Sequence, residues 1–361
     1  MIKYLEVPDF HYNPADRETA KIKAEAVYKA ATENRVDFIA LPGDLFDRPI
    51  VATDKGGYNN IRQIVKKWLS VCPVVAVEGT PSHDGKGCYS PLEDLVLTLL
   101  KPNLTHKYDR EKGVDKGSTG DGHDCLLFGI PELNKKTIQA KLGLSAEQAN
   151  AEAVKQLTQY VAEYIAPKRL QYKDIPAIVL MHGVVSDSAQ INTDDRIIKA
   201  SDIVIHTEDL EIAQIDRWSL GHLHKPWESA KICAGYAGSS SLTWGETDFI
   251  PAMNMITIEP GYKAKIDRIP YGTPTRKKIF KPLKEYDPQI AYWLYTDDQR
   301  AQKPTGHPLS KITYNEKRKE TSRITKEQAA NIKGLVDLFK MIDPDVTDSV
   351  LEKVETLETQ T

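Results

Sequence analysis

Five apolar runs in this sequence have the length and composition of buried β-strands, and a carboxylate or an imidazole follows closely after each. They span residues 2–7, 36–41, 74–77, 177–181 and 215–220. Runs with helical spacing separate the first three, and the clearest covers 17–34. Strands that alternate with helices predict an α/β fold. Strand signals dominate after Leu220, which favours two packed sheets with helices outside.

Short polar motifs follow these strands. In order they read Asp9-Phe10-His11, Gly43-Asp44-Leu45-Phe46-Asp47, Ser82-His83-Asp84, His182-Gly183 and Gly221-His222-Leu223-His224. Each motif alone is also what a solvated loop carries. Ligands of α/β sheets bind beyond the carboxyl ends of the strands, so the five motifs together favour one shared site. Mixed imidazole and carboxylate ligands suit manganese, iron or zinc, and a pair of such ions about 3.5–4 Å apart needs a bridging carboxylate.

The ordered motifs resemble those of the calcineurin-like metallophosphoesterases. Within that superfamily they look most like the SbcD-type DNA repair nuclease subunit and its phage recombination-nuclease relatives. The runs 41–49, 216–226 and 236–246 carry the subgroup resemblance, and the whole resemblance covers residues 1–270. It implies a four-layer αββα metallophosphoesterase sandwich with a small C-terminal α+β or helical appendage.

The resemblance also implies two divalent metal ions, with Mn²⁺ as the expected metal, and a role for each motif residue. The first ion takes Asp9, His11, Asp44 and His224. Asp44 bridges to a second ion, which also takes His182, His222 and Ser82. His83 is the implied catalytic residue, because it would contact the phosphate and help to protonate the leaving oxygen. Asp84 would orient the His83 ring.

The third motif departs from the family's usual Gly-Asn-His-Asp. This chain has Gly79-Thr80-Pro81-Ser82-His83-Asp84, so two residues are inserted and Ser82 stands where asparagine is expected. A serine hydroxyl is a poorer metal ligand than an amide carbonyl. The sequence therefore predicts a second ion that is held loosely.

The composition changes near residue 272. Residues 273–326 carry thirteen Lys and Arg against six Asp and Glu, whereas 327–361 carry eight acidic residues against three lysines. We predict a catalytic domain at 1–272, a basic capping or DNA-contact segment at 273–326 and a helical partner-docking tail at 327–361. The alternative for the last two parts is a small helical appendage with a solvated face.

Other features bound the class of protein. The formal net charge of −3 gives little support to a dedicated nucleic-acid binder, although a local basic surface remains compatible with it. No window resembles a transmembrane helix, and Met1 leads directly into a strand, so no signal peptide is expected. The four cysteines lack a C-x-x-C spacing, which favours reduced thiols and a cytoplasmic location, in bacteria or in the host of a phage.

The leading functional prediction is a metal-dependent DNA nuclease that hydrolyses phosphodiesters at DNA ends. The resemblance implies that it works as the nuclease subunit beside an SbcC-like, SMC-type ATPase, with a homodimer as one assembly and no membrane partner. Two alternatives remain open. One is a phosphatase or phosphodiesterase that acts on a small molecule or phosphoprotein. The other is a degenerate scaffold subunit without catalysis.

Overall fold

The computed structural model describes residues 1–49, 55–85, 87–95, 98–100, 105–111, 113–116, 124–133, 135–189, 203–242, 249–259 and 262–314. The chain divides into two compact units, Met1–Thr275 and Arg276–Thr361. The predicted boundary at 272/273 lies close to this division. The predicted tail at 327–361 lies outside the described residues.

The first unit contains a six-stranded sheet in the order β15-β14-β1-β2-β3-β4. Strands β1 to β4 are mutually parallel, and β14 and β15 continue the sheet antiparallel beside β1. The strands span Ile2–Glu6 (β1), Phe38–Pro42 (β2), Val74–Val77 (β3), Thr98–Leu99 (β4), Ala252–Ile258 (β14) and Lys265–Pro270 (β15). The carboxyl ends of β1, β2 and β3 therefore meet at one edge.

A seven-stranded sheet of the same unit has the order β12-β13-β11-β8-β7-β5-β6, with β13, β11, β8 and β7 mutually parallel. Its strands span His106–Asp109 (β5), Gly113–Lys116 (β6), Cys125–Ile130 (β7), Ala177–His182 (β8), Arg217–Gly221 (β11), Trp227–Glu228 (β12) and Ala234–Tyr236 (β13). A short pair, β9 (Val184–Val185) and β10 (Val204–Ile205), follows β8.

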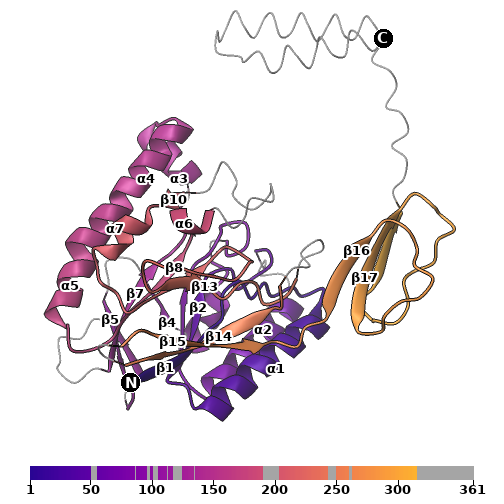
Figure 1. The fold of residues 1–361 in the computed structure, drawn as a ribbon, viewed down its shortest axis with the longest axis horizontal. Helices are drawn as coiled ribbons and strands as arrows, with labels where there is room; N and C mark the ends of the chain where they lie inside the picture. The colour runs from indigo at the N-terminus through magenta and orange to yellow at the C-terminus, as the bar shows by residue number, and fades with distance from the viewer. Residues whose placement is uncertain are drawn as a thin grey trace, which may run out of the picture. The chain divides into compact units, whose positions relative to one another are not determined.

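The two sheets pack face to face between two layers of helices (Figure 1). Residues of both sheets, such as Tyr4, Phe38, Leu127 and Ile178, share one buried core. Helices α1 (Arg17–Asn34) and α2 (Lys55–Leu69) cover the six-stranded sheet. The other sheet is covered by α4 (Ala146–Tyr160), a π-helical turn (Val161–Ile165) and α5 (Ala166–Gln171). Shorter helices are α3 (Lys135–Leu142), α6 (Ser186–Ala189) and α7 (Thr207–Glu211). The predicted αββα sandwich is confirmed.

Local sequence signals explain where the long helices begin. The Asp16 side chain accepts a hydrogen bond from Thr19 N at 3.2 Å and caps α1. Ser145 and Gln148 form a reciprocal capping box at the start of α4. The capping-box sequence Ser90-Pro91-Leu92-Glu93 predicts a helix that ends near Leu100. The structure instead has a 3₁₀ helix (Ser90–Leu95) followed by β4, because Thr98 and Leu99 pair with β3.

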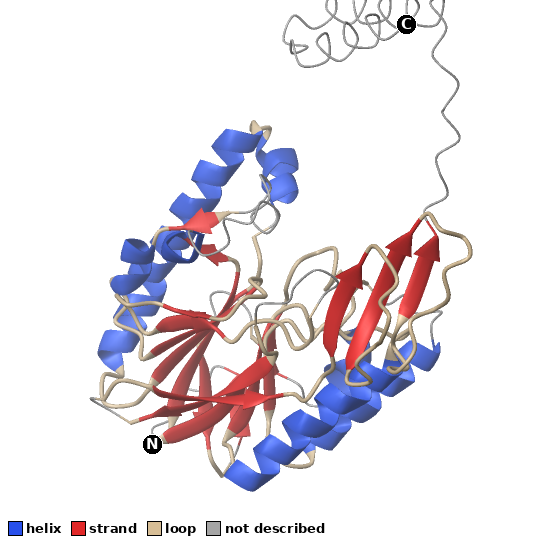
Figure 2. Cartoon of the chain, turned by 45° about the vertical axis from the view of Figure 1, so that its right-hand side comes forward, coloured by secondary structure: helices blue, strands red, loops and turns tan. Residues whose placement is uncertain are grey.

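The second unit is described as far as Tyr314. Its sheet has the order β16-β17-β18, formed by Thr275–Ile279, Ile290–Thr296 and Lys311–Tyr314 (Figure 2). Ile279, Tyr292, Leu294 and Ala301 form its small core. The described part of the basic segment is thus a sheet and not a helical appendage. Among the helices that the structure describes in either unit, none is long and apolar enough to cross a membrane.

Candidate metal centre

The loops that follow β1 and β2 lie side by side, and this places their acidic and imidazole side chains together. Asp9 N donates to the Gly43 carbonyl at 3.2 Å, and His11 N donates to the Asp44 carbonyl at 3.0 Å. The Ser240 hydroxyl donates to the Asp9 carbonyl at 3.1 Å, which ties in the loop after β13. These backbone bonds extend the strand pairing beyond the sheet and fix the loops that carry the motifs.

Two glycines let the two sheets meet at this edge. A Cβ atom at Gly43, whose φ is +88°, would collide with the His182 ring. A Cβ atom at Gly221 would collide with the Pro42 carbonyl. The end of β2 therefore touches the ends of β8 and β11 only because both positions lack a side chain. This contact brings ligands from the two sheets into one cluster.

Among the residues that the structure describes, four overlapping groups of side chains could hold metal ions, and within each group the ligand atoms lie within 4.8 Å of one another. They are Asp9 with His11 and His224, His11 with Asp44 and His83, Asp9 with Asp44 and His182, and Glu132 with His182 and His222. Asp44 and Asp9 each belong to two groups. All six imidazole and aspartate ligands predicted from the sequence thus lie in one continuous cluster.

The donor set fits divalent metal ions. The Nε2 atoms of His11 and His224 face each other at 3.0 Å. Two nitrogen ligands at right angles around an ion, each about 2.1 Å from it, are separated by about 3.0 Å. The Nδ1 atom of His11 is buried without a hydrogen-bond partner. Buried polar atoms normally have a hydrogen-bond partner. A buried imidazole nitrogen without one is more typical of a cation site than of ordinary core packing.

Asp44 lies between the two halves of the cluster. Its Oδ1 accepts from Thr80 N at 2.6 Å and lies 3.4 Å from His182 Nε2. His182 Nδ1 donates to the Pro42 carbonyl at 2.8 Å, so its Nε2 is the nitrogen that faces the site. A backbone carbonyl commonly fixes the tautomer and the orientation of a ligating histidine in this way.

The electrostatics are those of a charge-paired site. Burial alone would raise the pKa of Asp44, but His182, His11 and His83 hold that pKa well below its usual range. Burial alone would lower the pKa of His182, but Asp44, with Asp9 and Glu132, raises it to about 10. Burial raises the pKa of Asp9 to about 6. Without a metal ion, a proton on His182 therefore supplies part of the positive charge that these carboxylates need.

Backbone strain is concentrated at the same residues. Six non-glycine residues have positive φ in the described chain, and four of them are Asp9 at 46°, His11 at 46°, Asp44 at 50° and His222 at 103°. A non-glycine residue in such a region costs on the order of 1–3 kcal/mol and persists only where the surroundings enforce it. Strain at four predicted ligands supports a functional constraint on this cluster.

His83 lies at the rim of the cluster, with its ring centroid 4.9 Å from that of His11. Its Nδ1 is 2.6 Å from the Asp47 carbonyl, so it donates there and leaves Nε2 as the outward nitrogen. The predicted role of Asp84 in orienting this ring is corrected. Asp84 accepts from Gly79 N at 2.9 Å, Phe46 N at 3.1 Å and the Tyr89 hydroxyl at 2.9 Å. It therefore braces two loops, and a backbone carbonyl orients His83.

Ser82 is also corrected. The side chain beside Asp44 and His182 is that of Thr80, whose Oγ1 lies 3.2 Å from Asp44 Oδ2 and 3.2 Å from His182 Nε2. His83 N and Asp84 N both donate to the Thr80 carbonyl at 2.8 Å, which closes a tight turn. Thr80 thus takes the place expected of the asparagine, and Pro81 and Ser82, both exposed, form the inserted part of this turn.

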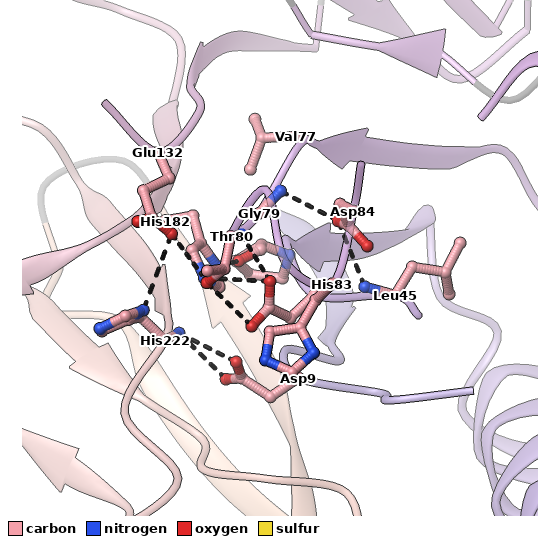
Figure 3. Close-up of polar contacts among 12 residues, drawn as sticks. Asp9, Leu45, Val77, Gly79, Thr80, His83, Asp84, Glu132, His182 and His222 are labelled. Carbon is pink, nitrogen blue, oxygen red and sulfur yellow. Dashed lines mark hydrogen bonds and ion pairs between the residues drawn. The ribbon is translucent and has the colours of Figure 1, made fainter. Parts of the chain in front are cut away.

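Glu132 belongs to the cluster but was missed from the sequence. It follows β7, and its Oε2 lies 3.8 Å from His182 Nε2 and 3.9 Å from His222 Nδ1 (Figure 3). The signal that could have found it is the strand-end rule that found the other ligands. Residues 125–130 read as a strand, and Pro131-Glu132 comes directly after it.

Comparison with known proteins leaves the family open. No family model and no curated protein matches this sequence. Among solved structures, GAP50, described as the anchor in the inner membrane complex of Plasmodium, matches with 13% identity over 74% of this chain and 88% of its own, at a TM-score of 0.42. TT1561 of Thermus thermophilus matches with 13% identity over 74% of this chain and 99% of its own, at a TM-score of 0.41. Similarity at this level assigns no family, so the fold assignment rests on strand order and layer packing.

Proposed function

We propose that this chain is a calcineurin-like metallophosphoesterase of the SbcD type, a dinuclear metal-dependent nuclease that hydrolyses phosphodiester bonds of DNA. The observation that carries the proposal is the position of Asp44. This carboxylate is shared between a ligand group with His11 and one with His182. A carboxylate shared by two ligand groups is the arrangement that a bridging ligand of two ions requires.

The residues of the cluster suggest a division of labour. Asp9, His11, Asp44 and His224 would hold one ion, and Asp44, His182 and His222 would hold the other. Bound divalent ions would supply a lowered water pKa and charge stabilisation, and Mn²⁺ suits this mixed ligand set. The Nδ1–H of His83 is held by the Asp47 carbonyl, so its Nε2 faces outward, and in the imidazolium form that nitrogen would bind the phosphate and pass its proton to the leaving oxygen.

The second unit supports DNA over a small substrate. Along β17, Tyr292 and Leu294 are buried, whereas Trp293 and Tyr295 alternate with them onto the other face. Lys278 Nζ lies 4.7 Å from the Trp293 ring centroid, and Lys311 Nζ lies 4.2 Å from it. Basic side chains beside aromatic rings are the features that bind nucleic-acid backbones and stack on bases.

The test is a nuclease assay on linear double-stranded DNA with the full-length protein across Mn²⁺, Mg²⁺ and Zn²⁺. We expect cleavage from the ends with Mn²⁺ and none after chelation. The variant Asp44→Asn should lose cleavage and bound metal together. A wild-type protein that binds Mn²⁺ but leaves DNA intact while it cleaves small phosphodiesters would contradict the proposed substrate.

One observation favours the second candidate, a phosphodiesterase that acts on a small molecule. An apolar pocket opens beside Glu132 and His222 and is lined by Ile130, Leu157 and Ile205 among others. The pocket has room only for a small apolar group, which a small phosphodiester would place beside His222. Comparison of turnover on DNA with turnover on p-nitrophenyl diesters decides between the two candidates.

Partner and location belong to the same proposal. We propose that the chain works beside an SbcC-like, SMC-type ATPase in the cytoplasm, either as one subunit or as a homodimer. The support is the sequence of the tail, where Ile332, Leu335, Val336 and Phe339 recur at the spacing of an apolar helical stripe.

A further inference from the structure

Glu132 is held in place by the protein backbone before any ligand is considered. Its N–H donates to the Glu78 carbonyl at 3.2 Å, so the loop after β7 is tied to the loop after β3. Pro131 precedes it and restricts the backbone at this point. The carboxylate therefore reaches the cluster from a fixed position and not from a mobile surface loop.

The Oε2 atom of Glu132 is buried and has no hydrogen-bond partner. Its neighbours are His182 Nε2 at 3.8 Å and His222 Nδ1 at 3.9 Å. A carboxylate that served only to fix a histidine would approach it to about 2.7–2.9 Å. A buried carboxylate oxygen that accepts no hydrogen bond is costly, so this separation calls for an explanation.

A shared cation explains the separation. Two ligand atoms that lie opposite each other across an ion, each about 2.1 Å from it, are about 4.2 Å apart, and ligands at right angles are about 3.0 Å apart. The distances of 3.8 and 3.9 Å from Glu132 Oε2 fall between these limits. His182 Nε2 also faces this point, because Nδ1 is bonded to the Pro42 carbonyl.

We infer that Glu132 is a ligand of the ion held by His182 and His222, and that it supplies the oxygen that the resembling family takes from asparagine. The inference rests on the metal centre of the proposed function and adds a residue to it. Thr80 offers only a neutral hydroxyl beside Asp44. An anionic oxygen at Glu132 compensates for that weak donor, and it shifts preference toward Mn²⁺, which favours oxygen ligands more than zinc does.

The test titrates Mn²⁺ into metal-free, full-length protein by calorimetry, with bound metal counted after desalting. The variant is Glu132→Gln, which keeps the shape and removes the charge. The matched control is Glu78→Gln, an exposed acid in the loop that Glu132 contacts. We expect two bound ions in wild type and in the control. In Glu132→Gln the second ion should bind more weakly by at least the roughly 10–100-fold that loss of an outer-shell partner costs, while the first is unchanged.

Thermal unfolding separates a ligand from a structural carboxylate. Metal-free Glu132→Gln should unfold close to the wild-type temperature, because the side chain keeps its shape and only a long ion pair with His182 is lost. Its stabilisation by added Mn²⁺ should be smaller than in wild type. A second-ion affinity in Glu132→Gln within twofold of wild type would overturn the inference and leave the proposed function intact. Wild-type protein that binds two ions and cleaves no DNA would instead contradict the proposed function, and the titration would still decide the role of Glu132.

Discussion

At the scale of single residues, His83 offers the sharpest separation of chemistry from metal binding. It is fixed by the Asp47 carbonyl and lies at the rim of the cluster. His83→Ala should lower phosphodiester turnover by about 10²–10⁴-fold, the usual contribution of a general acid, and leave metal content unchanged. Turnover on a p-nitrophenyl diester and metal counting on the same preparation check this. Retained turnover in His83→Ala would show that the leaving oxygen takes its proton elsewhere.

Thr80 and Ser82 provide a matched pair for the second ion. Thr80→Asn places an amide carbonyl beside Asp44 and His182 and should tighten the second Mn²⁺ by about 1 kcal/mol, roughly fivefold. Ser82→Asn should leave the titration unchanged, because Ser82 is exposed on the inserted turn. Activity as a function of Mn²⁺ concentration reports both effects. A tighter second Mn²⁺ in Ser82→Asn and an unchanged one in Thr80→Asn would show that Ser82 is the ligand.

The residues of the site differ in how far the sequence could reveal them. Asp9, Asp44, His182 and His222 were predictable, because each lies at or just after the end of a strand and the strand ends of a parallel sheet converge. The position of Thr80 was not predictable, because the two inserted residues can be placed on either side of it in the sequence. Only the turn that the Thr80 carbonyl closes decides which residue faces the site.

At the scale of elements, a buried charge network joins the two sheets. Arg217 on β11 bonds Glu6 on β1 at 3.1 Å and Glu228 on β12 at 2.9 Å, and both Arg217 and Glu6 are buried. Arg217→Met leaves Glu6 as an uncompensated charge and should lower the free energy of unfolding by about 3–5 kcal/mol. Urea unfolding of wild type and variant measures this loss of unfolding free energy. The exposed pair Lys29–Glu33 is the control, and Lys29→Met should change stability by less than about 0.5 kcal/mol.

The pH dependence of this network follows from Glu6. Burial raises the pKa of Glu6 in the folded protein. A carboxyl with a raised folded pKa costs stability once the pH exceeds its unfolded pKa, and the cost grows until the pH passes the folded value. Loss of Arg217 raises that folded pKa further. The destabilisation in Arg217→Met should therefore be larger at pH 8 than at pH 5. An equal loss of unfolding free energy at both pH values would show that the charge of Glu6 is not its cause.

The elements themselves were predictable where local signals were strong. Helix α1 and strands β2, β3, β7 and β8 appear close to their expected ranges, since apolar periodicity and caps are local properties. Strand β4 was not foreseen, because its two residues are extended only by pairing with β3. The short strand β5 depends in the same way on pairing with β7 and β6.

At the scale of the whole molecule, the two units should separate hydrolysis from DNA binding. The three cores of the sandwich lie within residues 1–275, and the second unit has its own core. The fragment 1–275 should hydrolyse a small diester within about twofold of the full chain.

In the full chain, neutralising Arg276, Lys277 and Lys278 together should weaken DNA binding and flatten its salt dependence by roughly one unit of slope per lost phosphate contact. Filter binding at several salt concentrations checks this, and an unchanged slope would place the DNA contact elsewhere.

The C-terminal tail should likewise separate binding of the proposed ATPase partner from hydrolysis. Residues 315–361 lie outside the described structure, but the sequence places Ile332, Leu335, Val336 and Phe339 at helical spacing. An isolated helix of this length is marginal in water, and an apolar stripe gains stability by docking into a groove. Deletion of 325–361 should therefore spare diester hydrolysis and abolish co-purification with the proposed ATPase partner. The matched variant Leu335→Asp/Phe339→Asp, which keeps the length of the chain, should reproduce the loss. Binding that survives both changes would show that the ATPase docks on the folded units and that the tail serves another purpose.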